Sequence, residues 1–502
     1  MKRIFLAALC LVSTTASGMT YVEKAHLTMT SPGWHAALRE TLLDQQLALP
    51  VAERINGKLQ FTGFYHEVLN EKNLAEYFGM SNAATGKNND YIGVDPTNSN
   101  ELLHTLDLIH NHGQSSASDV GLRDRVQMRP WRRAFGGTVE YHQKLGGACS
   151  RLGLRFGMPF AESKTRLSPK SILDIAREAT LPGTTTTVSL LDFLAGNVSG
   201  DDSAGNAQSA LAKMKVTTDD QKKLDLGNPG FSVHFRFCDR PQGYVDGSAG
   251  VIIPLGTEPT GEFKFEPTVG NGRHWGFSCG VSAHAALSET CESRFEIVAR
   301  AKYRYLFAGD ETRAPYFQYA GGSMPAWPHY ILMGKQGSTT LFPAANVLTK
   351  KYRITPGHQL DVVGGFAYDN SRLRFEIGGS ILFRDQEKAE VIEWDNDTYA
   401  VADYSYDSSS ANTFDYQTDG YSLKGLENAP AAERAINSTS LLMSSIQTPR
   451  TIVYAMHASM GYAVESCKYP IVFGAGFGRD VLASNNAWAK EWIAWANLGA
   501  NF

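Results

Sequence analysis

The chain has 502 residues, of which 43% are hydrophobic and 20% charged, and its formal net charge is −4. This slightly acidic balance argues against a nucleic-acid partner, which favours a basic protein. The mean hydropathy of −0.25 would suit a soluble protein. It equally suits a membrane barrel, whose lumen-facing and lipid-facing residues alternate and give an intermediate average.

Residues 1–18 have the pattern of a secretory signal peptide. Lys2 and Arg3 precede an apolar run over residues 4–12, and small residues follow at 16–18. The run is about half of the roughly 20 residues that a transmembrane helix needs, so we expect cleavage near Met19. Removing Lys2 and Arg3 leaves 45 basic against 51 acidic residues. No later stretch is long enough for a membrane helix, so an integral membrane protein could only be a barrel.

Residues 19–56 follow this segment and are predicted to be partly helical. Trp34, Leu38, Leu42 and Leu43 recur there at helix-like spacing. Two positions stay open for the segment, either in the periplasm or inside the barrel as a plug entering from below. The periplasmic position is the simpler of the two.

Residues 57–502 are predicted to form one all-β, transmembrane antiparallel β-barrel. Alternation over about ten residues marks about twelve strands, at 57–68, 133–145, 150–161, 230–237, 244–254, 274–285, 294–307, 358–369, 372–384, 451–463, 470–480 and 492–502. Twelve is even, and short and long connections alternate, as in barrels with short periplasmic turns and long extracellular loops. Residues 119–128, 343–354 and 415–423 could add strands, so fourteen is the alternative.

The segment 294–305 shows the two faces most clearly. Its apolar phase is Phe295, Ile297, Ala299, Ala301, Tyr303 and Tyr305. Its other phase is Arg294, Glu296, Arg300, Lys302 and Arg304. Each of these charges would cost about 2–4 kcal/mol at the lipid midplane, so we expect them to face a watery lumen.

The inward phase of the strands is rich in charge. The residues expected to line the lumen and set its selectivity are Arg151, Arg155, Arg236, Arg300, Lys302, Arg304, Arg374, Glu296 and Glu376. Charged rings set pore selectivity, and cations are in excess, so we predict a modest anion preference. The alternative is a lumen whose salt bridges only hold the barrel together. Transport of a hydrophobic ligand would need an apolar inward stripe, whereas this phase is charged.

Five cysteines remain after residue 18. Four of them lie in or beside the short turns, namely Cys149, Cys238, Cys291 and Cys467. The periplasm is oxidising, and Cys149 with Cys238, in successive turns, is the favoured pair among three connectivities. The chain has no CxxC or CxxH spacing, so no metal site is predicted.

The long loops differ from one another. Residues 171–180 and 207–215 have helix-like patterns, whereas 308–357 is rich in aromatic residues, glycine and proline. A loop of this length and composition either folds inward as a constriction or packs on its neighbours. Five inward histidines show no spacing that singles out a nucleophile, a base and a carboxylate. The protein is therefore predicted not to be an enzyme and to need no cofactor.

The last strand ends on an aromatic residue, and Phe502, Leu498 and Trp492 share its apolar face. This pattern resembles the C-terminal sorting signal of bacterial outer-membrane barrels, which implies recognition by the barrel assembly machinery. Residues 355–361 and 269–274 resemble segments of uncharacterised porin-like proteins of Dependentiae-type bacteria. The chain as a whole resembles a porin-like family, which implies an outer-membrane channel for small polar solutes. The alternative function is a non-conducting barrel whose loops serve as surface structure or adhesin.

Overall fold

The structure of the protein is a computed structural model of the whole chain. It describes residues 57–69, 91–94, 124–146, 151–171, 179–180, 187–201, 207–240, 242–290, 292–317, 328–370, 372–401, 415, 434–464, 469–484 and 490–502. The signal peptide expected at 1–18 and the segment 19–56 lie outside these ranges. Both therefore stay predictions.

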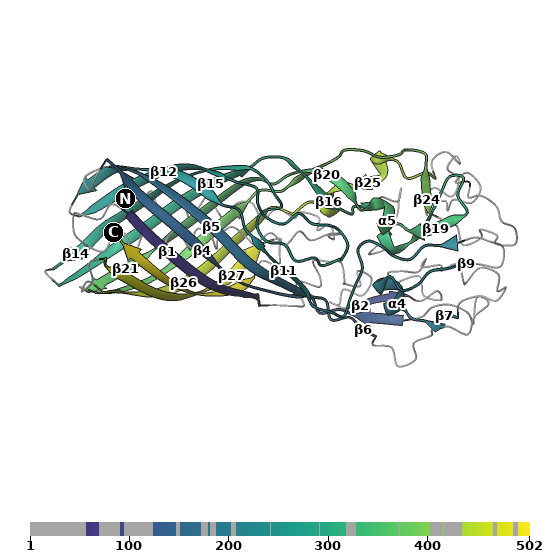
Figure 1. Cartoon of the computed structure of the whole chain (residues 1–502), viewed down its shortest axis with the longest axis horizontal. Helices are drawn as coiled ribbons and strands as arrows, with labels where there is room; N and C mark the ends of the chain where they lie inside the picture. Colours follow the sequence, from purple (N-terminus) through teal and green to yellow (C-terminus); the bar gives the residue numbers. More distant parts are fainter. Residues whose placement is uncertain are drawn as a thin grey trace.

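Twelve antiparallel strands close into a barrel (Figure 1). In order around the wall they are β4 (Trp131–Leu145), β5 (Leu152–Arg166), β12 (Gly230–Arg240), β13 (Gly243–Ile252), β14 (Gly276–Glu289), β15 (Ser293–Leu306), β21 (Gly357–Asn370), β22 (Leu373–Arg384), β26 (Thr451–Val464), β27 (Ile471–Ser484), β28 (Glu491–Asn501) and β1 (Gly57–Val68). Pairing of β1 with β4 closes the ring. Every backbone group of the wall can therefore find a partner without water.

These strands match the twelve predicted segments to within five residues at every end. The prediction of a closed all-β barrel is confirmed. Both ends of the described chain, at Gly57 and Phe502, lie at the end of the barrel where the connections are short, and the long connections leave the opposite end (Figure 1). Among the described residues, no helix is long and apolar enough to span a membrane.

Strand β5 continues past its predicted end at residue 161, and Pro159 lies in its middle. Up to Gly157, β5 pairs with β12; from Phe160 onward it pairs with β11 (Gln221–Leu226). Proline has no N–H to give to the ladder, and the partner strand changes beside it. The Gly227 N–H donates to the Pro159 carbonyl at 2.7 Å. Pro159 therefore marks an interruption in one ladder and not the end of the strand.

The two faces of β15 separate as the sequence predicts. Phe295 and Ile297 are 39% and 36% exposed on the outer face, whereas Glu296 and Arg300 are 1% and 6% exposed on the inner face. Alternate residues of an antiparallel strand point to opposite sides of the sheet. The barrel thus has an apolar exterior and a charged interior, as a membrane-spanning barrel requires.

Aromatic rings lie at both rims of the apolar exterior. Tyr65 and Trp492 contact near the end with long connections, with ring centroids 5.2 Å apart. Tyr141 and Phe502 stack near the other end at 6.3 Å. Aromatic girdles of this kind sit at the two interfaces of a bilayer.

The long connections fold into a second body beyond the outer end of the barrel, which we call the cap (Figure 1). It consists of the described parts of 69–130, 167–229, 253–275, 307–356 and 385–450. Its elements are β2 (Tyr91–Val94), β3 (Asp124–Gln127), β6 (Lys170–Ser171), β7 (Ala179–Thr180), β8 (Thr187–Val188), α4 (Leu190–Ala195), β9 (Gly200–Asp201), β10 (Ala207–Gln208), β11, β16 (Gly309–Arg313), β17 (Tyr316–Phe317), η2 (Pro328–Tyr330), β18 (Leu332–Lys335), β19 (Thr340–Pro343), α5 (Ala345–Leu348), β20 (Lys350–Thr355), β23 (Lys388–Val391), β24 (Tyr399–Val401), η4 (Ser438–Ser440), β25 (Leu441–Leu442) and η5 (Met443–Ile446).

The cap accounts for two of the three segments that could have added barrel strands. Residues 119–128 contribute β3, and residues 343–354 contribute α5 and most of β20, all outside the barrel wall. The third segment, 415–423, is described only at Asp415. The fourteen-strand alternative is therefore wrong, since the closed wall has twelve strands.

The cap has a hydrophobic core of its own. Phe193, Met214, Phe265 and Tyr330 come from three connections and are all at most 2% exposed. The Tyr330 hydroxyl donates to the Met214 carbonyl at 2.6 Å. The described parts of 308–357 therefore pack on neighbouring loops, which is the second of the two arrangements predicted for that segment.

Candidate functional site

Glu296 on the inner wall is the centre of an ion-pair network near the end of the barrel that has the short connections. Its carboxylate accepts a hydrogen bond from Arg374 at 2.6 Å and lies 3.3 Å from Arg294 and 3.4 Å from His284. Arg374 also donates to Asp369 at 2.7 Å. These groups come from β14, β15, β21 and β22, so the network ties four neighbouring strands together.

Other charges of the inner wall are also paired. Arg155 donates to Glu140 at 3.2 Å across β4 and β5. Arg236 donates to Asp246 at 2.8 Å and lies 4.2 Å from the centre of the Tyr244 ring. Each pair joins two neighbouring strands of the wall. Whether such salt bridges only hold the barrel together, which is the alternative to a selective lumen, stays a prediction.

The residues predicted to line the lumen can now be located individually. The inner faces of their strands hold Arg155, Arg236, Arg300, Lys302, Arg304, Arg374, Glu296 and Glu376. Arg151 differs, since it precedes β5 at the rim with the short connections and is exposed. Glu376 faces His457 of β26 at 3.3 Å. The role of these residues in selectivity stays a prediction.

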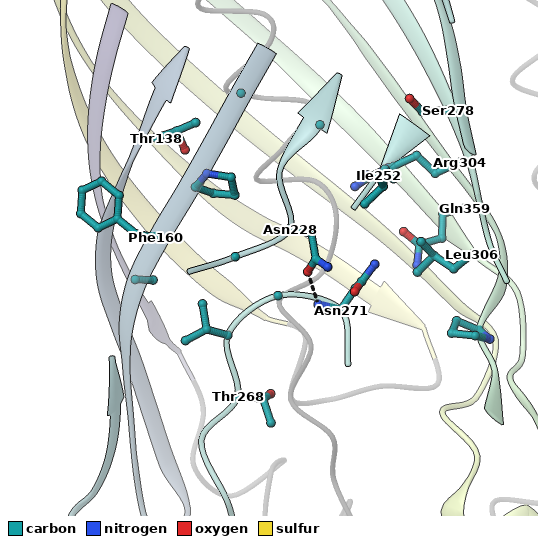
Figure 2. Close-up of a pocket in the computed structure, with 18 of the residues that line it drawn as sticks. Thr138, Phe160, Asn228, Ile252, Thr268, Asn271, Ser278, Arg304, Leu306 and Gln359 are labelled. Carbon is teal, nitrogen blue, oxygen red and sulfur yellow. Dashed lines mark hydrogen bonds between the residues drawn. The ribbon is translucent and has the colours of Figure 1, made fainter. Parts of the chain in front are cut away.

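A cavity of about 250 Å³ lies in the outer part of the lumen (Figure 2). Nine barrel strands contribute to its lining, from β1 to β22, and parts of four cap connections complete it. Thr138 and Phe160 lie on one side, and Arg304 and Gln359 lie on the other (Figure 2). Its lining also includes several hydroxyl and amide side chains, namely Ser163, Ser232, Ser278, Asn228 and Asn271.

The connection 253–275 reaches into this cavity, and Asn228 holds it in place. The side-chain oxygen Oδ1 of Asn228 accepts a hydrogen bond from the Asn271 backbone N–H at 2.7 Å, as Figure 2 shows, and the side-chain Nδ2 of Asn228 donates to the Ile253 backbone carbonyl at 3.1 Å. Gly270 passes so close that a Cβ there would lie 2.3 Å from the Asn228 oxygen, and its φ is +91°. Only glycine fits such a close left-handed passage.

The connection 253–275 supplies Thr268, Val269, Gly270 and Asn271 to the cavity wall. The segment 308–357, for which the sequence left open an inward fold or packing on its neighbours, supplies Glu311 and Pro356. The GNGRH segment at 270–274 is the sequence signal that could have predicted the inward course of the connection 253–275. Two glycines with positive φ, Gly270 and Gly272, flank Asn271 there.

A buried cluster of charges fixes the cap to the outer rim. His274 Nε2 lies 2.7 Å from Glu311, and Arg313 donates to Glu311 at 2.9 Å and to Glu387 at 2.7 Å. Arg384, at the end of β22, donates to Glu387 at 2.6 Å. Burial disfavours the charged form of Glu387, but the neighbouring Arg313 and Arg384 outweigh it and hold its pKa well below the usual range.

The inner wall also has an apolar patch that the sequence pattern did not predict. Leu382, Val453, Ile493 and Trp495 face inward from β22, β26 and β28 and are at most 5% exposed. Phe64 of β1 packs against them. These side chains pack against one another and are almost inaccessible to solvent. They therefore do not offer an apolar stripe to a ligand.

Glycines on β27 make room for this patch. Gly474, Gly476 and Gly478 face inward, and a Cβ on Gly476 would lie 2.2 Å from the indole of Trp495. The GxGxG pattern is thus explained by close side-chain packing across the β27–β28 ladder. It has no phosphate-binding geometry.

The cysteines are only partly described. Cys238 is exposed and Cys279 is half-buried, and both carry free thiols as far as the described residues go. Cys149, Cys291 and Cys467 lie outside the described ranges, so the Cys149–Cys238 pair stays a prediction. Within those ranges, no group of three or more His, Cys, Asp or Glu residues is arranged to hold a metal ion.

No protein-family model and no curated protein sequence matches the chain. Among solved structures, the chain is similar to the transport unit of the autotransporter AIDA-I from Escherichia coli, with 7% identity, coverage of 94% of this chain and 99% of that chain, and a TM-score of 0.31. It is similar to the NanC porin at 8% identity, with coverage of 76% and 99% and a TM-score of 0.25. It is also similar to a Pseudomonas aeruginosa FadL homologue at 8% identity, with coverage of 89% and 90% and a TM-score of 0.29. Similarity at this level leaves the function to be argued from the lumen itself.

Proposed function

We propose that the protein is a channel of the bacterial outer membrane for passive transport of small polar solutes, with a weak preference for anions. The observation that carries this proposal is the charged inner wall of the closed barrel, which opens onto a cavity of about 250 Å³ lined by both polar and apolar residues, with Arg155, Lys302 and Arg304 among them. Charged and hydroxyl side chains inside a membrane barrel are stable where ion pairs, hydrogen bonds, water or a polar solute satisfy them.

We also propose how the protein reaches the outer membrane. The segment 1–18 would direct export and be removed, and the lipid bilayer would surround the apolar exterior. The barrel assembly machinery would recognise the last strand, where Trp492, Leu498 and Phe502 share the outer face. The proposal includes the expectations that the protein is not an enzyme, needs no cofactor and binds no nucleic acid.

Conductance in planar bilayers tests the channel. The purified protein should give stepwise current increments, and the reversal potential in a KCl gradient should indicate that Cl⁻ is more permeant than K⁺. Protein that inserts but gives no current steps would contradict the channel. A reversal potential of cation-selective sign would contradict the anion preference alone.

The cap supports a second candidate function, a non-conducting barrel that acts as a surface structural protein or adhesin. Its core of tightly buried residues from several connections makes it a folded body and not a set of loose loops. Removal of the cap distinguishes the two candidates. A channel should keep or raise its conductance without the cap, whereas an adhesin should show no current in either form and lose surface binding.

A further inference from the structure

Three cations lie side by side on the outer face of the wall. Lys164 of β5 is paired directly with Arg133 of β4 on one side and with Lys222 of β11 on the other. The three strands are neighbours at the outer end of the barrel (Figure 1). The residues next to them on β4 and β5, Arg132 and Ser163, are buried on the inner face at 1% exposure, so the three cations belong to the opposite face. We call Arg133, Lys164 and Lys222 the cation row.

The cation row lies just beyond the aromatic rings at the outer rim. Tyr65, one of these rings, is paired with Phe135 of β4, and Arg133 lies two residues further out on the same strand. Two residues of a strand span about 6.8 Å, which a strand tilt of about 40° reduces to about 5 Å along the barrel axis. Girdle rings lie at the headgroup level of a bilayer. The cation row is therefore at the level of lipid phosphate groups.

The surface between the cation row and the middle of the barrel is apolar and open. Phe135 is 65% exposed and Leu224 is 70% exposed, both in the row of residues next to the cation row. One step further toward the middle, Leu226 of β11 is paired with Phe160 of β5. Acyl chains cover such an apolar exterior in a membrane. Cations directly beside an acyl-chain surface suit a ligand with an anionic head and apolar chains.

Carboxylates on the same face neutralise part of this charge. Asp220 forms ion pairs with Lys164 and with Arg166, and one bond to Arg166 measures 2.9 Å. Glu67, opposite Arg133 on β1, accepts hydrogen bonds from the Trp131 indole at 2.7 Å and from a tyrosine hydroxyl at 3.1 Å. Among the described residues of these four strands and Asp220 beside them, the face beyond the rings has four cations and three carboxylates, namely Arg133, Lys164, Arg166 and Lys222 with Glu67, Glu162 and Asp220.

The cation row places like charges directly opposite one another, an arrangement that destabilises a sheet. Two such contacts follow in succession, Arg133 with Lys164 and Lys164 with Lys222. The Asp220 ion pair reaches the middle cation of the row. Neighbouring strands are about 4.8 Å apart, so the Cα atoms of Arg133 and Lys222 are about 10 Å apart. Both side chains are long enough to reach one phosphate group between them, which relieves both repulsions.

Trp131 gathers the charged ends of three side chains in one place. The Arg133 and Arg166 guanidinium carbons lie 5.2 Å and 5.6 Å from the centre of its ring. The Lys164 ammonium lies 6.0 Å from it. Cations within about 6 Å of a tryptophan ring are attracted to its face, and a guanidinium group binds phosphate with two parallel hydrogen bonds. The charged ends are thus held together before any ligand arrives.

We propose that the cation row is a binding site for the phosphate group of a membrane lipid. The phosphate lies between Arg133 and Lys222 and over Lys164, and the acyl chains cover Phe135 and Leu224. The ligand is a lipid and not free phosphate, because the charged and the apolar surfaces are continuous. The site is on the outer face of the wall, so this inference goes beyond the proposed channel and does not depend on whether the lumen conducts.

Native mass spectrometry of the full chain, folded in maltoside micelles that contain no phosphate, tests the ligand. The probes are dipalmitoyl phosphatidic acid, which has both a phosphate and acyl chains, and dipalmitoylglycerol and inorganic phosphate, which each have one of the two. We expect phosphatidic acid to bind at least tenfold more tightly than either, which corresponds to one charge-assisted hydrogen bond. Equal binding of the two lipids would overturn the role of the cations. Inorganic phosphate that binds as tightly as phosphatidic acid would overturn the lipid in favour of free phosphate.

A double variant locates the site on the wall. Arg133→Gln combined with Lys222→Gln should weaken phosphatidic acid binding at least tenfold and leave dipalmitoylglycerol binding unchanged. The matched control combines Arg450→Gln with Lys223→Gln. Arg450 lies over the Phe383 ring, 4.7 Å from its centre, and Lys223 is the exposed neighbour of Lys222 on the opposite face of β11. Heat-dependent mobility on gels checks that each variant is a folded barrel. Equal affinity of the two double variants for phosphatidic acid would overturn the site.

Urea unfolding distinguishes a lipid site from a purely structural role of these cations. Without added lipid, the Arg133→Gln, Lys222→Gln variant should unfold at about the wild-type urea concentration, because the relief of like-charge contacts offsets the lost attraction between Arg133 and Glu67. Phosphatidic acid should raise the urea midpoint of the wild type and of the control, since a ligand that binds the folded state stabilises it. The same rise in the Arg133→Gln, Lys222→Gln variant would overturn the proposal.

Discussion

Gly476 gives a sharp test of how the inner wall is packed. It pairs with Trp495 across β27 and β28, and a Cβ at Gly476 would lie 2.2 Å from Trp495 Cζ2 and 2.9 Å from the Ala458 carbonyl oxygen. Carbon atoms in contact stay about 3.5–4.0 Å apart, so the indole would have to retreat by about 1.3 Å or more. Phe64 and Ile493 pack against it and oppose that movement.

We therefore expect Gly476→Ala to destabilise the folded barrel by about 1–3 kcal/mol, the usual cost of overpacking. That corresponds to about 5- to 150-fold in the folding equilibrium. Urea unfolding in phosphocholine micelles, followed by gel mobility of the folded band, measures the change. In the double variant Gly476→Ala with Trp495→Leu, the added methyl group should cost much less stability than it does beside Trp495.

Gly461→Ala is the matched control for this experiment. Gly461 is an inward glycine on the neighbouring strand β26, where the nearest atom to an added Cβ is the Phe473 carbonyl oxygen at 3.6 Å. This variant should unfold at nearly the same urea concentration as the wild type. If Gly476→Ala and Gly461→Ala unfold together, the indole does not lie over Gly476 and the packing described here is wrong.

Three further predictions follow from the faces of the wall and from the buried charges. Ile297→Arg, on the lipid face of β15, should cost about 2–4 kcal/mol in vesicles, whereas Ile392→Arg, at an exposed cap position, should cost much less; equal urea midpoints would contradict the assigned faces. Glu296→Gln should lose about 1–3 kcal/mol, because the buried Arg374 loses one charged hydrogen-bond partner and keeps Asp369 as the other, and Glu289→Gln at the exposed end of β14 serves as its control. Glu387 stabilises the cap through its depressed pKa, so this stabilisation is complete above the ordinary value of 4.5 and is lost as the pH falls below it. The melting temperature by near-ultraviolet circular dichroism should therefore drop from pH 7 to pH 4 less steeply in Glu387→Gln than in the wild type, and equal slopes would contradict this reasoning.

The barrel could be predicted from the sequence because its signal is repeated in every strand. Charged and apolar residues alternate with a period of two, as at Glu296 and Ile297. This alternation identifies the strand and also which of its faces points into the lumen. The alternation of short and long connections then gives the topology. The largest error at a strand end is in β5, which continues to Arg166 past its predicted end at residue 161, because the strand changes its partner from β12 to β11 beside Pro159.

The cap and the cavity were much harder to predict. The helix-like pattern at 207–215 gives β10 and irregular chain, whereas α4 forms at Leu190–Ala195. The capping box of α4, formed by Ser189 and Asp192, is the local sequence signal for this helix. The cavity depends on contacts such as Asn228 with Asn271, which join residues far apart in the sequence and have no local signature.

The measurement that tests the central claim most directly is a spin-label scan along β15, from residue 293 to residue 306, in lipid vesicles with the native cysteines replaced. Labels at 295, 297, 299 and 301 should collide with oxygen dissolved in the lipid. Labels at 296, 300, 302 and 304 should collide instead with a water-soluble nickel complex. The two accessibilities should alternate out of phase with a period of two residues. Accessibilities that rise and fall together along the strand would contradict a lipid-facing exterior around a watery interior.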